Sequence, residues 1–190
     1  MIAACAHLVP GSGLESRYLE GKDEFLSGKA GDLDKAVAVF ESVAREDPTY
    51  KDSLTMLGRA YYRKGRYNDA NAILQRAVAV NKDDEVAWLA LALTQLRLGE
   101  DRKGLESLNR GIGLLGKVTG KGPRSYPEWD RKGLVRSATQ RTALLAAKGV
   151  AEKENLIRSA DTLLIRIDDE ENFQRSDSKQ EYRRVYTGNP

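Results

Sequence analysis

The sequence has very few of the residues that build disulfides and metal sites. Its 190 residues include one cysteine and one histidine. One cysteine cannot form an internal disulfide, and the two side chains together cannot supply the four ligands of a structural zinc site. No stretch approaches about 18 consecutive apolar residues, so no membrane-spanning helix is expected.

Aromatic residues are also scarce, at 7%, and the 17 glycines follow no three-residue period, which excludes a collagen-like chain. Apolar residues make up 41% and charged residues 31%, the balance of an ordinary soluble globular chain. The length fits one domain, or one domain with an appendage.

The net charge of +3 conceals a pattern along the chain. Residues 1–50 contain five basic and nine acidic residues, and residues 51–118 contain twelve and eight. Residues 119–150 contain seven basic and two acidic residues, whereas residues 151–190 contain seven and nine. The middle of the chain is therefore the basic part.

A 34-residue period runs through the first two thirds of the sequence. The unit that starts at Lys51 has small and large apolar residues at helical spacing. Residues of the same kind recur 34 residues earlier and 34 residues later in the chain. Gly31, Gly65 and Gly99 are expected between the two helices of each unit, where a left-handed residue ends a helix at little cost. The pattern predicts helices at about 54–64, 67–80, 85–98 and 101–115.

These residues resemble the tetratricopeptide repeat (TPR) family. The match is strongest in the second unit, through Leu57-Gly58, Tyr61, Gly65-Arg66-Tyr67 and Ala70, and the third unit keeps Trp88, Leu91 and Gly99. The first unit departs from the pattern, because Glu24 stands at its glycine slot. The resemblance implies an all-α fold, a TPR α-solenoid of about three helical hairpins.

The remaining segments are assigned around these repeats. The expected organisation is a flexible tether at 1–16, repeats at 17–50, 51–84 and 85–118, a basic linker at 119–127, a longer capping helical hairpin at 128–168 and a polar tail at 169–190. Pro127 suits the first position of the hairpin's first helix. A divergent last hairpin is typical of the cap of a solenoid.

The resemblance also implies that the first helix of each repeat lines a concave protein-binding groove. That face would present Thr55, Arg59, Tyr62, Arg63, Leu89, Leu93, Leu96 and Arg97. Its arginines suit carboxylates and its apolar residues suit apolar anchors, so an extended or helical peptide, or a subunit surface, with both features is the expected ligand. The alternative is that the C-terminal hairpin covers these residues. The side chains that clamp a chaperone's C-terminal carboxylate in some TPR domains are missing, because Thr55 and Arg59 occupy those positions.

A basic segment is the second candidate site. It comprises Lys117, Lys121, Arg124, Arg131, Lys132, Arg136 and Arg141. Its two aromatic residues are too few and too clustered for a base-stacking platform, so a solvated face or a patch for an acidic partner is favoured over nucleic acid. A phosphate- or nucleic-acid-binding module using residues 117–141 is the alternative function.

Catalytic sites and cofactors are not expected. Gly111, Gly113, Gly116 and Lys117 satisfy the spacing of a nucleotide-binding loop, but such a loop follows a β-strand, and here it would follow a helix. The only histidine and cysteine lie together near the N-terminus. The sequence therefore predicts a non-catalytic scaffold or adaptor that docks on partner subunits of a larger assembly, with self-association as a further option.

The N-terminus leaves two alternatives for localisation. Ile2-Ala3-Ala4-Cys5 resembles the end of a bacterial lipoprotein signal, but only Met1 precedes it where an apolar segment is required. An exported, periplasmic protein anchored through a lipid on Cys5 is favoured, in which case the assembly belongs to the bacterial envelope. An unmodified thiol in a cytoplasmic protein is the alternative.

Overall fold

The computed structural model describes residues 13–27, 30–118 and 129–187, and within them the chain forms helices and no β-strand. The helices are α1 (Leu14–Ser27), α2 (Ala30–Glu46), α3 (Ser53–Arg63), α4 (Tyr67–Val80), α5 (Glu85–Arg97), α6 (Asp101–Lys117), α7 (Leu134–Ala146) and α8 (Lys153–Thr187). None of them combines the length and the apolar composition needed to cross a membrane.

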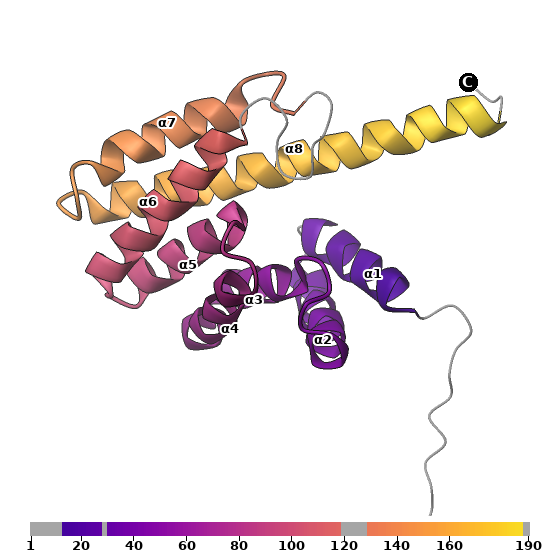
Figure 1. The fold of residues 1–190 in the computed structure, drawn as a ribbon, viewed down its shortest axis with the longest axis horizontal. Helices are drawn as coiled ribbons and strands as arrows, with labels where there is room; N and C mark the ends of the chain where they lie inside the picture. The colour runs from indigo at the N-terminus through magenta and orange to yellow at the C-terminus, as the bar shows by residue number, and fades with distance from the viewer. Residues whose placement is uncertain (1–12, 28–29, 119–128, 188–190) are drawn as a thin grey trace, which may run out of the picture.

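The first six helices form three hairpins that stack side by side into an α-solenoid (Figure 1). In the second and third hairpins, Gly65 and Gly99 lie in the tight turns with φ of 71° and 80°. A residue with a Cβ is strained at such an angle, so glycine ends the first helix of each pair there. The helix bounds predicted between residues 54 and 115 agree with the structure to within two residues.

Small residues bring the two helices of a hairpin close together. A Cβ built on Gly58 of α3 would lie 2.7 Å from Leu74 Cδ2 of α4, and one built on Gly104 of α6 would lie 2.7 Å from Leu96 Cγ of α5. Both distances are far below van der Waals contact. The glycines therefore make room for leucines of the facing helix, which are fully buried.

The first hairpin is offset from the 34-residue register by three residues. The register places Glu24 at the small-residue slot, but Gly21 fills it, and a Cβ there would meet Phe40 Cε1 at 3.0 Å. Gly31, expected in the turn, lies in the first turn of α2. Helix α2 has 17 residues and α4 has 14, so the three extra residues of α2 account for the offset.

Helix α7 begins at Leu134, later than the predicted start at Pro127, which lies outside the described residues. The residues directly before α7 form turns, and Asp130 has a φ of 51°. The Asp130 carboxylate accepts the backbone N–H groups of Val135 at 2.9 Å and Arg136 at 2.8 Å. This carboxylate satisfies two of the N–H groups that have no partner within the helix and so sets where α7 starts.

Helix α8 continues to Thr187, through the segment that was expected to be a polar tail. It lies across the first helices of the hairpins, and its second half projects beyond α1 (Figure 1). Its buried apolar residues join the core of the repeats; they are Leu156, Ile157, Ala160, Leu163, Leu164 and Ile167. The helix does not end near Asp168 because Asp168, Glu171 and Gln174 are also buried, in polar contacts.

The glycine packing generates a first prediction, which compares two helical glycines. Gly58→Ala should lower the free energy of unfolding by about 1–3 kcal/mol, because the new methyl group must displace Leu74. Gly113→Ala should raise it by about 0.5–1 kcal/mol, since Gly113 lies in α6 with nothing within 4 Å of its Cβ position. Urea unfolding of both variants measures the difference, and equal effects would contradict this account of the hairpin seam.

Candidate functional site

The first helices of the three hairpins, α1, α3 and α5, form one surface, called here the concave groove, and α8 lies along it (Figure 1). The sequence left open whether this groove is free for a ligand or covered by the C-terminal hairpin. In the structure α8 of that hairpin covers it. The arginines that were expected to meet carboxylates do meet them. The carboxylates belong to α8.

Asp168 of α8 lies between two arginines of α3. One carboxylate oxygen accepts from Arg59 Nη2, and the other accepts from Arg63 Nη2 at 2.7 Å. Arg59 and Asp168 are only 4% and 5% exposed. The guanidinium of Arg63 also stacks on the Phe25 ring, with its Cζ 3.9 Å from the ring centre, and donates to the Phe25 carbonyl oxygen at 2.9 Å. These contacts join α1, α3 and α8 at one point.

The electrostatics of this pair follow from its burial. Burial alone would lower the pKa of Arg59, but the charge of Asp168 and the hydrogen bond to it raise that pKa above its usual value. For Arg63 burial outweighs the carboxylate, and the pKa falls. Arginine remains protonated in proteins, so both side chains are cations on a buried carboxylate.

Asp161 of α8 forms a second contact, seven residues or about two helical turns closer to the N-terminus of α8. It accepts a hydrogen bond from the Tyr62 hydroxyl at 2.8 Å and lies 3.5 Å from Arg97 Nη2. Arg97 is also 3.7 Å from Glu154 Oε2. Burial raises the pKa of both Asp161 and Tyr62. Tyr62 and Arg97 of the predicted groove therefore also face α8.

Lys22 and Phe25 of α1 belong to the same groove, and the 34-residue register missed both. Lys22 Nζ lies 2.6 Å from Glu171 Oε1 in a pair whose side chains are 3% and 9% exposed. Because the first hairpin is offset, a spacing of 37 residues, the one that relates Gly21 to Gly58, aligns Lys22 with Arg59. That spacing was the signal in the sequence that would have found this third cation.

The remaining predicted groove residues serve the packing between helices. Thr55 donates to the Asp84 carboxylate at 2.6 Å, and Asp84 caps α5 by accepting the Ala87 N–H at 2.8 Å. Leu89, Leu93 and Leu96 are fully buried. Leu89 and Leu96 pack on Gly111 and Gly104 of α6, in the seam of the third hairpin.

The structure does not bring the residues of the glycine motif or of the basic segment together into a site. Gly111, Gly113 and Gly116 lie inside α6, not in a loop after a strand. Of the basic residues, Lys121 and Arg124 lie outside the described residues, as does Cys5. Lys117 ends α6, Arg131 and Lys132 lie in turns, and Arg136 and Arg141 are exposed on α7. Five residues separate the last two, which turns their side chains about 140° apart around the helix.

No group of histidine, cysteine and carboxylate side chains in the described parts of the chain has the makeup of a metal site. The carboxylates of the concave groove are instead used in pairs with cations and with Tyr62. This arrangement holds two helical surfaces together and leaves no unpaired acid or base at the groove contacts described above. The chemistry of these contacts is that of one helix packed against a groove.

Stacked hairpins with a concave face define the class of the protein, an α-solenoid of helical repeats. Residues 29–96 match the sequence model of the tetratricopeptide repeat family, so this part of the chain consists of TPR repeats. One crystal structure of MamA aligns with a TM-score of 0.53 and 20% identity, over 86% of this chain and 81% of the MamA chain. Another aligns with a TM-score of 0.50 and 20% identity, over 91% and 94%. At this identity the likeness concerns the fold, and no curated protein matches the sequence.

The raised pKa of Asp161 generates a second prediction. A carboxyl whose pKa is higher in the folded protein than in the unfolded chain takes up its proton first in the folded state, so it adds stability as the pH falls. The wild type should therefore gain stability relative to Asp161→Asn between neutral pH and about pH 4. Urea unfolding of both proteins across this range measures the difference. If the wild type gains no stability relative to the variant as the pH falls, or loses stability relative to it, the burial of this carboxylate is contradicted.

Proposed function

We propose that this protein is a non-catalytic scaffold that binds helical segments of proteins in its concave groove. The observation that carries the proposal is the way α8 lies in that groove. Three of its carboxylates, on Asp161, Asp168 and Glu171, meet cations of three different helices. Spacings of seven and three residues put these carboxylates on one face of the helix.

The groove selects a helix by two features together. Cations from α1, α3 and α5 lie along it, and each is placed for a carboxylate of the bound helix. Apolar residues of α8 share the core with those of the repeats. An amphipathic helix with carboxylates beside its apolar face is therefore the ligand that fits, a helix-in-groove mode of recognition.

In this chain α8 is the resident helix. A partner subunit that docks through the groove has to present the same pattern of carboxylates and apolar residues and to replace α8. The lipid anchor predicted at Cys5 would place such a scaffold in an assembly at the bacterial envelope. No described contact favours the alternative of a nucleic-acid-binding module.

A third prediction tests recognition of the helix apart from its covalent connection. A protease site placed between α7 and α8, in the turn at residues 147–152, allows the folded chain to be cut there. The cut protein should keep the α8 fragment during gel filtration. An added peptide of residues 153–187 carrying a heavy isotope should then exchange into the complex, as measured by mass spectrometry.

Two neighbouring residues of α8 supply matched fragments. Asp168→Asn removes the carboxylate from both groove arginines, whereas the Asp169 side chain is 58% exposed and pairs with Arg166 of its own helix. Loss of one partner of a buried pair costs about 3 kcal/mol or more, so the Asp168→Asn fragment should bind about 100-fold more weakly. The Asp169→Asn fragment should bind like the wild type. Equal binding by both fragments, or failure of the added peptide to exchange, would overturn the proposal.

A further inference from the structure

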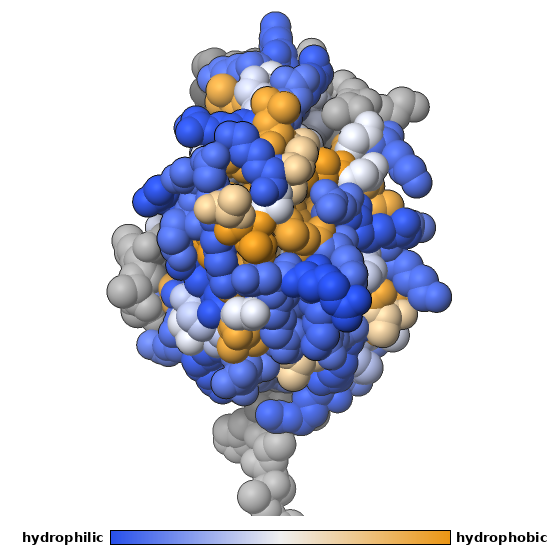
Figure 2. Space-filling model, turned by 90° about the vertical axis from the view of Figure 1, so that its left-hand side faces the viewer, coloured by the Kyte–Doolittle hydropathy of each residue, from blue (hydrophilic) through white to orange (hydrophobic). Residues whose placement is uncertain are grey.

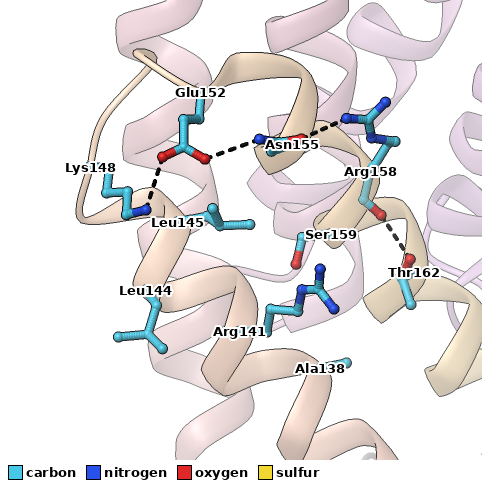
Figure 3. Close-up of a pocket in the computed structure, with 10 residues that line it drawn as sticks. All are labelled: Ala138, Arg141, Leu144, Leu145, Lys148, Glu152, Asn155, Arg158, Ser159 and Thr162. Atoms are coloured by element: carbon cyan, nitrogen blue, oxygen red, sulfur yellow. Dashed lines mark hydrogen bonds and ion pairs between the residues drawn. The ribbon is translucent and has the colours of Figure 1, made fainter.

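The terminal hairpin carries a second groove, on the side of α8 that faces away from the repeats. We call it the outer groove; it lies between α7 and α8 and has a volume of about 680 Å³. Its lining includes Arg141, Leu144, Lys148, Glu152, Asn155 and Arg158. Figure 3 shows these side chains projecting from α7, from α8 and from the turn that joins the two helices. The groove makes no use of the residues that bind α8 to the concave groove.

Apolar side chains are exposed at this end of the molecule. Leu144 is 71% exposed and Val150, in the turn that follows α7, is 38% exposed. Figure 2 views the end of the solenoid where this turn lies, and apolar residues gather there within a border of hydrophilic ones. A cap that only faced water would be expected to have a polar outer surface.

The outer groove is also cationic. It has three cations, Arg141, Lys148 and Arg158, and one carboxylate, Glu152, which accepts from Lys148 at 2.9 Å and from Asn155 at 3.0 Å. These hydrogen bonds lower the pKa of Glu152, so it is ionised and already engaged. Arg158 donates to Asn155 at 2.6 Å, and within the described ranges no carboxylate pairs with Arg158 or Arg141. A ligand with carboxylates could therefore supply the negative charge that Arg141 and Arg158 lack in this groove.

A groove between two helices is the surface on which the next hairpin of this chain begins. Helix α3 packs on α1 and α2, and α5 packs on α3 and α4. In the part of the chain that the structure describes, no helix covers the outer groove of α7 and α8. The ligand that fits its shape is accordingly a helix.

The other end of the same solenoid offers such a helix. The outward side of α1 exposes Leu19, at 40%, together with Glu20 and Asp23. Residues 1–50 carry a net charge of −4, from five basic and nine acidic residues, whereas residues 119–150 carry +5, from seven basic and two acidic residues. The 14 residues of α1 span about 21 Å, and the lining of the outer groove runs for about 12–14 Å along each helix, so α1 is long enough to fill it.

We propose that the outer groove of one molecule binds α1 of a second copy of this chain, head to tail. Glu20 and Asp23 then meet Arg141 and Arg158, and Leu19 covers Leu144. A two-fold pairing of outer grooves would instead bring like cations together, which is unfavourable. Because the two contacting surfaces differ, the assembly is open-ended and adds further copies with concentration. This proposal does not depend on the concave groove.

Sedimentation equilibrium of the full chain tests the proposal. The weight-average mass should rise with protein concentration beyond that of a dimer, and added salt should reduce it, since the contact pairs exposed charges. A mass that stays at the monomer leaves the outer groove to a different, acidic partner and overturns the proposal. A mass that stops at the dimer also overturns it.

Two variants, each altered at one end, make the test specific. Arg141→Glu with Arg158→Glu reverses the groove, and Glu20→Lys with Asp23→Lys reverses α1; each alone should associate at least 100-fold more weakly than the wild type. Mixed one to one, they should regain association as alternating copies, because the intact groove of one meets the intact α1 of the other and the reversed groove meets the reversed α1. The chain with all four changes should regain association by itself for the same reason. No association in the mixture would overturn the proposal.

A matched control reverses two arginines elsewhere. Arg76 on α4 and Arg102 on α6 are exposed and lie outside both contact surfaces. Arg76→Glu with Arg102→Glu should associate like the wild type. If this control loses association to the same degree, net charge rather than the outer groove governs it, and the proposal fails. Circular dichroism of every variant confirms that the helices are retained.

Discussion

The structure depends on one buried carboxylate, that of Asp168, held between Arg59 and Arg63. A charge removed from water costs several kcal/mol unless a partner of opposite charge and hydrogen bonds replace its hydration. Both arginines come from α3, while the carboxylate comes from a helix more than 100 residues later in the chain. Neither side can be buried in this way without the other, so the pair specifies where α8 lies.

This long-range contact changes the character of the solenoid. Repeats of this kind contact their neighbours, and their stability is close to a sum of local terms. Here α8 bonds to α1 through Glu171, to α3 through Asp168 and to α5 through Asp161. One helix therefore connects all three hairpins, and separation of any hairpin from the stack must break a charge pair as well as apolar packing.

The apolar face of α8 determines how readily the concave groove can be emptied. Five large apolar residues of α8 are almost fully buried; they are Leu156, Ile157, Leu163, Leu164 and Ile167. At about 1.5–3 kcal/mol each, releasing α8 from its neighbours costs about 8–15 kcal/mol, whereas a peptide that binds with micromolar affinity supplies about 8 kcal/mol. A short acidic peptide cannot displace α8. Only a helix with an equally extensive apolar face can do so, which limits the partners that the groove admits.

The sequence predicted the features that depend on residues close together in the chain and missed those that depend on residues far apart. Glycine turns and the 34-residue period are local, and they placed α3 to α6 almost to the residue. The period failed in the first hairpin, where three extra residues in α2 move Gly21 into the slot expected for Glu24. The start of α7 depends on a cap by Asp130 in a left-handed conformation, which no pattern of apolar residues encodes.

The sequence predicted that the groove arginines bind carboxylates, but it did not predict which ones. No local pattern connects Arg59 with Asp168, which lies more than 100 residues later. The same pairings sort the charge of the whole molecule. Cations of the concave groove are neutralised by α8, so they add little to the field outside. The exposed excess of positive charge then lies at the terminal hairpin and that of negative charge at the first one. A net charge of +3 thus describes a solenoid whose two ends have opposite sign, because its groove is internally neutral.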